Sequence, residues 1–289
     1  MQQIQWYPGH MTKARRMMEE NVKFVDAVCE VLDARIPVSS RNPDIDTLAA
    51  GKPRMIILNR VDQADPELTK AWAAYFKAQG YGVVQTDSKT GTGVNSFLPA
   101  VRTLLRDKLE SYAEKGQTGR TVKVMIVGVP NVGKSSFINR VAKRKTAKAE
   151  DRPGVTRGKQ WVRLDSGVEM LDTPGILWPK FEDQSIGLNL AYTGAVRDDI
   201  MDIESLASNL CSDLVKKYPG VLNERYRVEP REDMQGWEIL ELCGRKRGFL
   251  ISGGEVDLER MAKILLDEYR GGKLGRMTLE KPEDVKHEG

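Results

Sequence analysis

The chain has 289 residues and a formal net charge of +4, with 40% hydrophobic and 30% charged residues, which is typical of a folded protein with one large or two medium domains. Its longest apolar runs, such as Met55–Leu58, are too short to cross a bilayer, and its first residues lack the apolar core of a signal peptide, so neither a membrane partner nor export is expected. The three cysteines form no CxxC pair and only two histidines occur, which argues against a disulfide framework or a zinc site and favours a cytoplasmic location.

Short β-type runs alternate with helical patterns between about residues 24 and 172. The pattern predicts strands at Ala27–Leu32, Arg54–Leu58, Gly82–Thr86, Val122–Val127, Gln160–Leu164 and Val168–Leu171. It predicts helices near Pro66–Gln79, Val94–Glu114 and Lys134–Lys143. Because strands that alternate with helices form parallel sheets, residues 1–178 are expected to be an α/β domain with a mainly parallel sheet. The polar segment Lys115–Arg120 is expected to be a flexible linker inside this domain.

The character of the chain changes after Pro179, where strand signals mostly vanish. Helical patterns follow at Gln184–Val196, Glu204–Tyr218 and Asp257–Arg270. The last has an apolar stripe at three- and four-residue steps, which is typical of a helix face that packs on a core. Residues 179–289 are therefore expected to form a small all-helical domain with a frayed tail from residue 279.

A glycine-rich segment, Gly128–Ser135, follows a predicted strand and precedes a predicted helix. It matches GxxxxGK[ST], in which backbone N–H groups turn inward around phosphate oxygens at a helix N-terminus. In such a loop Lys134 neutralises the β- and γ-phosphates, and the Ser135 hydroxyl binds Mg2+. An ordinary glycine-rich turn would not need a lysine and a serine at these positions. The predicted nucleotide-binding residues of the loop are Asn131, Val132, Gly133, Lys134, Ser135 and Ser136.

A second motif, DxxG, occurs downstream as Asp172-Thr173-Pro174-Gly175 at the end of a predicted strand. Asp172 is expected to hold Mg2+ and the Gly175 N–H to contact the γ-phosphate. In isolation these four residues would also make an ordinary turn. Between the two motifs lies Thr156, the best candidate for a switch threonine that binds Mg2+, although several other threonines are available.

Two further loops are expected to read the base. Asn59-Arg60-Val61-Asp62 follows a buried strand and resembles the NKxD guanine-specificity motif of GTPases. The Asp62 carboxylate can accept two hydrogen bonds from guanine N1–H and the 2-amino group, a donor pair that adenine lacks. The loop at Asp87-Ser88 resembles the SAK-type loop that contacts the base through the Ser88 amide. Arg60 stands where lysine is usual, so we expect altered affinity but retained specificity.

The order of these motifs is unusual, because the base-reading loops precede the phosphate loop, whereas ordinary GTPases have the phosphate loop first. A sheet can survive such a circular permutation when the old termini are joined, here through Val94–Arg120. The permuted order, the opening Trp6–Met11, the segment Asp33–Pro37 and the loop GVPNVGKSS resemble the ribosome biogenesis GTPase A family.

This resemblance implies a circularly permuted P-loop GTPase that binds GTP and GDP, uses Mg2+, and assists late assembly of the large ribosomal subunit. It also implies that the helical domain contacts ribosomal RNA, and a monomer is expected. Because the switch residues around Asp172–Leu177 run directly into the helical domain, nucleotide state is expected to be mechanically coupled to that domain.

The catalytic candidates are Lys134 and His10. Many GTPases place a glutamine after DxxG to orient the attacking water, but here that residue is Ile176, which cannot hydrogen-bond water. His10, the histidine outside the tail, either orients water instead or serves a turn or an RNA contact. Asn131 is similar to the asparagine of potassium-activated GTPases, so K+ is a candidate second cation, although Asn131 could equally stabilise the loop turn.

Basic residues form four clusters along the chain. They are Lys13/Arg15/Arg16, Lys143/Arg144/Lys145/Lys148, Arg152/Arg157/Lys159 and Arg245/Lys246/Arg247. A solvated mixed surface explains each cluster alone, but together they favour a phosphate-rich partner. Two other functions remain open. An ATP-dependent P-loop phosphotransferase would have no use for NRVD, and an rRNA-binding assembly factor with vestigial hydrolysis fits Ile176 but not the intact Lys134, Ser135 and Asp172.

Overall fold

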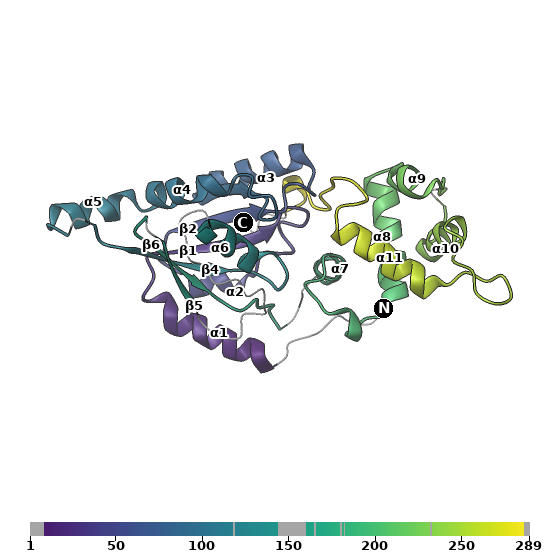
Figure 1. Ribbon diagram of the computed structural model, residues 1–289, viewed down its shortest axis with the longest axis horizontal. Helices are drawn as coiled ribbons and strands as arrows, with labels where there is room; N and C mark the ends of the chain where they lie inside the picture. The colour runs from purple at the N-terminus through teal and green to yellow at the C-terminus, as the bar shows by residue number, and fades with distance from the viewer. Residues whose placement is uncertain are drawn as a thin grey trace.

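The computed structural model describes residues 9–117, 119–143, 160–164, 166–179, 181, 183–231 and 233–285, with the side chains of residues 9, 10 and 143 outside the description. Within these ranges no helix is long and apolar enough to cross a bilayer. Figure 1 shows two regions, a sheet flanked by helices and a group of helices beside it.

The sheet has six strands in the order β3-β2-β1-β4-β6-β5. Their bounds are β1 Ala27–Asp33, β2 Arg54–Asn59, β3 Gly82–Thr86, β4 Val122–Val127, β5 Gln160–Leu164 and β6 Val168–Asp172. All neighbouring strands pair in parallel except β5, which runs antiparallel to β6. The expected mainly parallel sheet is therefore confirmed. Three strands extend one residue beyond prediction, to the polar residues Asp33, Asn59 and Asp172.

Helices cover both faces of the sheet. Their bounds are α1 Gly9–Val22, α2 Asp44–Leu48, α3 Pro66–Ala78, α4 Phe97–Leu104, α5 Arg106–Glu114 and α6 Lys134–Lys143. Val28 of β1 packs with α1 and α2, and Leu32 packs with α3 on the same face. The alternating residues Cys29 and Val31 pack with α4 and α6 on the other face. The sheet core is thus a three-layer α/β arrangement, with its strand ends free to carry a site.

The second region is helical, as predicted, and holds α7 Gln184–Tyr192, α8 Ile203–Lys217, α9 Val221–Tyr226, α10 Gly236–Lys246 and α11 Leu258–Arg270. The apolar stripe of α11 is buried against the neighbouring helices, as its periodicity predicts. Helix α7 ends before the predicted Val196 because Gly194 adopts a left-handed conformation, with φ of 78°. One hydrophobic cluster continues from the sheet region into this helical region, so the two regions pack directly against each other.

The end of the chain returns to the sheet region, which Figure 1 shows as the yellow segment beside α3. The Met277 amide donates to the Gln63 carbonyl, and the Leu279 amide donates to the Arg35 carbonyl. Leu279 is buried, and Val285 packs beside the α3 cluster. The expectation of a frayed tail is therefore wrong for residues 279–285, because these residues are fixed by contacts distant in sequence.

Candidate nucleotide-binding site

The phosphate loop leaves β4 and enters α6 at the carboxyl edge of the sheet. Two of its glycines are required by close approach. A Cβ on Gly128 would lie 2.5 Å from the Val31 carbonyl oxygen, and a Cβ on Gly133 would lie 2.4 Å from Asn59 Nδ2. Both glycines also have positive φ. The loop is therefore pressed against the ends of β1 and β2.

Lys134 lies at the centre of this loop with 7% of its surface exposed. Its ammonium donates to the carbonyl oxygens of Gly128 and Val129, each at 3.0 Å. Burial lowers the pKa of Lys134 to about 8, and the Asp172 charge opposes that shift. The ammonium can exchange these neutral carbonyl acceptors for phosphate oxygens, which are charged and accept stronger hydrogen bonds.

The candidate magnesium ligands lie together. The Ser135 hydroxyl is 3.5 Å from Asp172 Oδ2, at the start of α6 and the end of β6. A hydroxyl and a carboxylate oxygen fit the preference of Mg2+ for oxygen ligands, with phosphates and water completing its octahedron. Thr156, the third candidate ligand, lies outside the described residues.

The DxxG segment lies against the phosphate loop. A Cβ on Gly175 would be 2.7 Å from Pro130 Cα and 3.0 Å from Lys134 Nζ, so this position requires glycine. The Ile176 side chain faces away and is buried in the cluster beneath α1, with 1% exposed. Ile176 therefore supplies packing, and any water-orienting group must come from elsewhere.

Asn59 connects the base-reading loops to the phosphate loop. Its Nδ2 donates to the Val132 carbonyl at 3.0 Å. Its Oδ1 accepts from the Ser88 amide at 3.1 Å, the Ser88 hydroxyl at 2.7 Å and the Thr86 hydroxyl at 3.2 Å. Because only 2% of Asn59 is exposed, this side chain fixes three loops relative to one another. Sequence reasoning missed Thr86, whose only signal is a hydroxyl at the end of the strand.

Arg60 takes part in the same junction. Its Nη2 donates to the Asn131 carbonyl at 2.9 Å, and its Nε lies 3.5 Å from Asp33 Oδ2. Arg60 and Asn131 both adopt positive φ, of 63° and 57°. The arginine at the usual lysine position thus lies along the phosphate loop and fixes that loop's backbone.

The other predicted base-reading residues differ in exposure. Asp62 is exposed beside this junction, where its carboxylate can reach a ligand. Asp87 is buried, and its Oδ1 accepts from the amides of Lys89 and Thr90 at 2.8 and 3.2 Å, so it stabilises its own turn. Sequence reasoning also missed Arg140 of α6, whose Nε donates to the Ser88 carbonyl at 3.2 Å.

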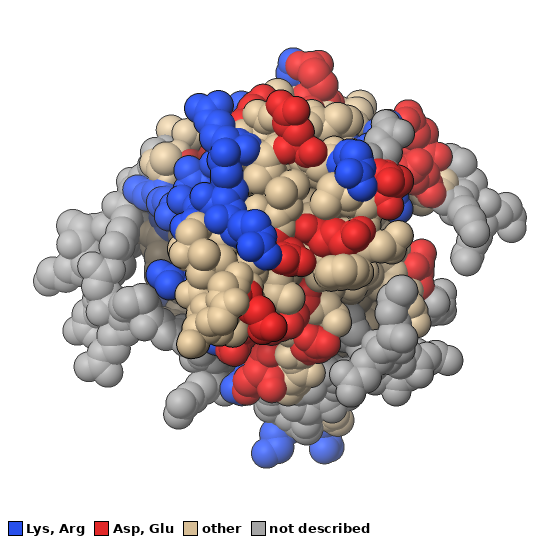
Figure 2. Space-filling view, turned by 90° about the vertical axis from the view of Figure 1, so that its right-hand side faces the viewer, with Lys and Arg blue, Asp and Glu red and all other residues tan. Residues whose placement is uncertain are grey.

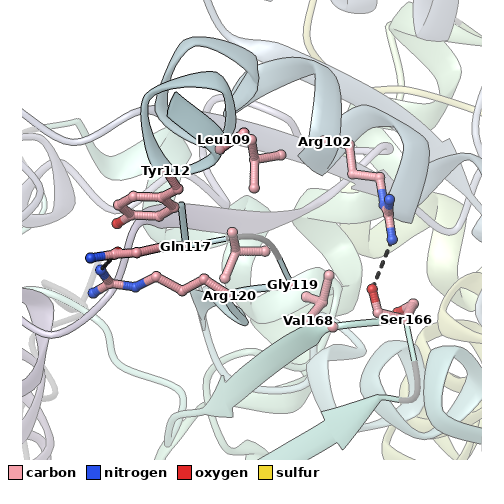
Figure 3. Close-up of a pocket in the computed structure, with 11 residues that line it drawn as sticks. Arg102, Leu109, Tyr112, Gln117, Gly119, Arg120, Ser166 and Val168 are labelled. Carbon is pink, nitrogen blue, oxygen red and sulfur yellow. Dashed lines mark hydrogen bonds between the residues drawn. The ribbon is translucent and has the colours of Figure 1, made fainter. Parts of the chain in front are cut away.

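Several predicted residues cannot be placed. The His10 side chain lies outside the described residues, as do Trp6–Pro8 and the basic residues 144–159. The permuted connection is described except for Thr118. Figure 3 shows that Gln117 and Arg120 of the predicted linker line a cavity with Tyr112. This cavity of about 270 Å³ lies beside the first residues of β4 and β6, at the sheet edge opposite the nucleotide site.

The described C-terminal basic cluster is exposed but partly paired. Arg245 contacts Glu241 at 2.8 Å, and Arg247 contacts Glu268 at 3.0 Å. Figure 2 looks onto the helical region and shows lysine and arginine side chains gathered in a band, with acidic side chains beside it. The face is therefore polarised, although part of its positive charge is balanced internally.

Comparison with known proteins gives concordant matches. The family model of the 50S ribosome-binding GTPases matches residues 123–221. Ribosome biogenesis GTPase A of Bacillus cereus is 46% identical over 282 residues, which cover 97% of this chain and 95% of the relative. A GDP-bound structure of YlqF has a TM-score of 0.69 and 28% identity, covering 92% of this chain and 99% of that one. A GNP-bound structure of YlqF from T. maritima has a TM-score of 0.66 and 30% identity, covering 94% and 100%.

Proposed function

Since the chain belongs to the ribosome biogenesis GTPase A family and is a GTP-hydrolysing ribosome assembly factor, we propose that it acts on the precursor of the large ribosomal subunit. The nucleotide-binding part of this proposal rests on the Asn59 junction. One buried amide joins a GxxxxGKS phosphate loop to both base-reading loops. A P-loop phosphotransferase for ATP has no need of this arrangement.

Guanine is proposed to be read by Asp62. Its exposed carboxylate follows the Asn59–Arg60 junction directly, where it can accept the N1–H and 2-amino hydrogens of the base. ATP would leave this acid without a donor pair and would be disfavoured. Asp87 accepts hydrogen bonds within its own turn, and it is proposed to support the base indirectly by fixing the shape of this loop.

Hydrolysis is proposed to depend on positive charge that the phosphate loop holds in place before the reaction begins. Lys134 would stabilise the negative charge that develops on the transferred phosphoryl group, and Ser135 and Asp172 would hold Mg2+, which supplies further positive charge to those oxygens. GTPases of this kind generally use Mg2+. Thr156 is proposed as a further ligand.

A second cation, K+, is proposed to bind near Asn131. In this structure the Asn131 Nδ2 donates to the Gly194 carbonyl at 2.7 Å, so its amide oxygen is the atom available to a cation. Turnover in K+ should exceed turnover in Na+. Equal rates in the two salts would leave Asn131 with a purely structural role.

Water is proposed to be oriented by His10, because Ile176 is buried in the core and cannot do so. His10→Ala should reduce turnover while leaving GTP affinity nearly unchanged. Normal turnover of this variant on ribosomal particles would assign His10 to another role.

The helical region is proposed to contact ribosomal RNA through its polarised face.

The experiment that tests the whole proposal measures hydrolysis of GTP and ATP, each with and without purified large-subunit particles. GTP should be hydrolysed faster than ATP, and the particles should stimulate GTP hydrolysis. Faster hydrolysis of ATP than of GTP, or a rate of GTP hydrolysis that is unchanged by the particles, would overturn the proposal.

A further inference from the structure

The nucleotide contacts proposed above do not involve the segment Asp33-Ala34-Arg35, yet this segment is buried where β1 ends beside the phosphate loop. Only 3% of Asp33 and 1% of Arg35 are exposed. Arg35 Nε and Nη2 contact the two carboxylate oxygens of Asp33 at 2.9 and 2.7 Å, which is a two-point ion pair. Breaking a buried pair of this kind leaves an uncompensated charge, so its partners are strongly constrained.

On one side this pair reaches the base-reading loop. Asp33 Oδ2 also lies 3.5 Å from Arg60 Nε, so one carboxylate is shared by two guanidinium groups. Arg60 in turn holds the Asn131 carbonyl of the phosphate loop at 2.9 Å. A shift of the phosphate loop therefore reaches Asp33 through a single side chain.

On the other side the pair reaches the helical region. The third nitrogen of Arg35, Nη1, donates to the Tyr269 carbonyl at 3.1 Å in the last turn of α11. The guanidinium also lies over the Tyr269 ring, 5.2 Å from its centroid. Figure 1 shows that this end of α11 points toward the sheet region.

A second line of contacts closes a ring. Arg270, the next residue of α11, donates to the Tyr192 and Ala191 carbonyls at 3.1 and 2.9 Å, at the end of α7. Two residues further along, the Gly194 carbonyl accepts from Asn131 Nδ2 at 2.7 Å. The phosphate loop thus contacts α11 by two routes that start at the same residue.

An open cavity of about 620 Å³ lies between Arg60 of the first route and Gly194 and Arg270 of the second, with Asn131 also lining it. Because open space lies between the routes, the polar contacts themselves connect the loop to the helices on this side. A set of polar contacts that can switch between two arrangements can transmit a local change to a distant element.

We propose that Asp33 and Arg35 are positioning residues that hold Arg60 against the phosphate loop and transmit nucleotide occupancy to the end of α11. This inference rests on the proposed nucleotide site, and it adds a route separate from the switch segment at residues 172–177. Occupancy that reorders Asn131 and Arg60 changes the hold of Arg35 on Tyr269, and thereby the anchoring of the helical region.

The test is amide hydrogen exchange of residues 271–279, compared with and without saturating GDP, after GDP binding has been confirmed by titration for each variant. In the wild-type protein GDP should change this exchange by about fivefold or more, which is the lower end of usual couplings between sites. Arg60→Ala leaves the buried Asp33–Arg35 pair and the contacts of Arg270 intact, so it should reduce the response to less than about half of the wild-type value. Arg35→Lys, which cannot reproduce the two-point pair, should do the same.

Arg225→Lys is the matched control, because Arg225 holds α11 through Glu268, outside the ring, at 2.8 Å. It should speed exchange with and without GDP and keep the response to GDP. A full response in Arg60→Ala, or no response in a wild-type protein that binds GDP, would overturn the inference. Failure of the wild-type protein to bind GDP would instead overturn the nucleotide site itself.

Discussion

At the scale of single residues, the site is organised by side chains that contact protein atoms as well as by those that would touch a nucleotide. Asn59 and Arg60 stand in a motif associated with base recognition, yet their nitrogens hold the backbone of the phosphate loop. Asp62 is different, because it is exposed and is itself proposed to accept hydrogen bonds from the base. Substitutions at these residues should therefore have different consequences.

Asp62→Asn tests base recognition. The amide cannot accept both guanine hydrogens, so GTP affinity should fall by about 2 to 3 kcal/mol, or roughly 30- to 150-fold, while xanthosine triphosphate gains affinity through its 2-oxo group. Competition binding with both nucleotides measures the change. Glu67→Gln, an exposed acid at the start of α3, is the control and should bind GTP normally. An unchanged preference for guanine in Asp62→Asn would remove the assignment.

Lys134 gives the site a pH dependence. Burial lowers its pKa to about 8, whereas bound phosphates favour the protonated ammonium and raise that pKa. Nucleotide affinity should therefore be full below about pH 8 and fall as the pH rises through that value, by about fivefold between pH 7 and pH 8.7. Calorimetric titration with GDP in two buffers of different ionisation enthalpy should show proton uptake at pH 8.5. Binding without proton uptake there would contradict the assigned pKa.

At the scale of elements, the sequence predicts the sheet well because each strand is a short apolar run bounded by polar or glycine residues. It misses α10, Gly236–Lys246, since two glycines interrupt the pattern. The structure explains them by packing. A Cβ on Gly236 would lie 2.0 Å from the Ser208 carbonyl oxygen, and one on Gly244 would lie 2.5 Å from Val256 Cγ1. Close helix approach is a tertiary property that a local pattern does not carry.

Which residues of the candidate site lie together was predictable in part, while their roles toward a nucleotide stay predictions. The phosphate loop and DxxG are contiguous motifs, and the structure brings Lys134, Ser135, Asp172 and Gly175 together as expected. Arg140 and the Asp33–Arg35 pair could not be assigned, because their contacts join residues tens to hundreds of positions apart. The prediction of a frayed C-terminal tail was wrong for the same reason, because the contacts that fix the tail are with residues distant in sequence.

That tail provides a test of stability. The Glu280 carboxylate accepts from the amides of Val38 and Ser39 at 2.6 and 3.0 Å and from Asn189 Nδ2 at 3.0 Å. Glu280→Ala removes the acceptor of the Val38 and Ser39 amides and one acceptor of Asn189, and should lower the free energy of unfolding by about 2 to 4 kcal/mol. Glu283→Ala, in the exposed part of the same tail, should change it by less than about 0.5 kcal/mol. Urea denaturation measures both, and equal stability of the two variants would contradict a fixed tail.

At the scale of the whole molecule, circular permutation places the nucleotide site at the junction of the two regions. The DxxG segment leads directly into the chain that forms α7, and Asn131 already contacts Gly194 at the end of that helix. One hydrophobic cluster spans both regions, so they respond to each other as packed bodies. Nucleotide state can therefore change how the helical region is held against the sheet region, which is the coupling that the proposed RNA contact requires.

Charge on that face sets how binding should respond to salt. Neutralising Arg245, Lys246 and Arg247 together should weaken association with large-subunit particles and flatten its salt dependence. The effect should be smaller than three free charges would give, because Arg245 and Arg247 already pair with Glu241 and Glu268. Neutralising three exposed lysines of the sheet region, Lys70, Lys77 and Lys115, should change association less. Equal losses from both trios, measured by co-sedimentation, would remove the assignment of this face.

The central claim is that GTP occupancy of this site governs association with the ribosomal particle, and co-sedimentation with large-subunit particles across a salt series tests it most directly. The protein should sediment with the particles in the presence of a non-hydrolysable GTP analogue, less with GDP, and less in every state as salt rises. Identical sedimentation with the analogue, with GDP and without nucleotide would contradict the account, even if binding to the particles persisted.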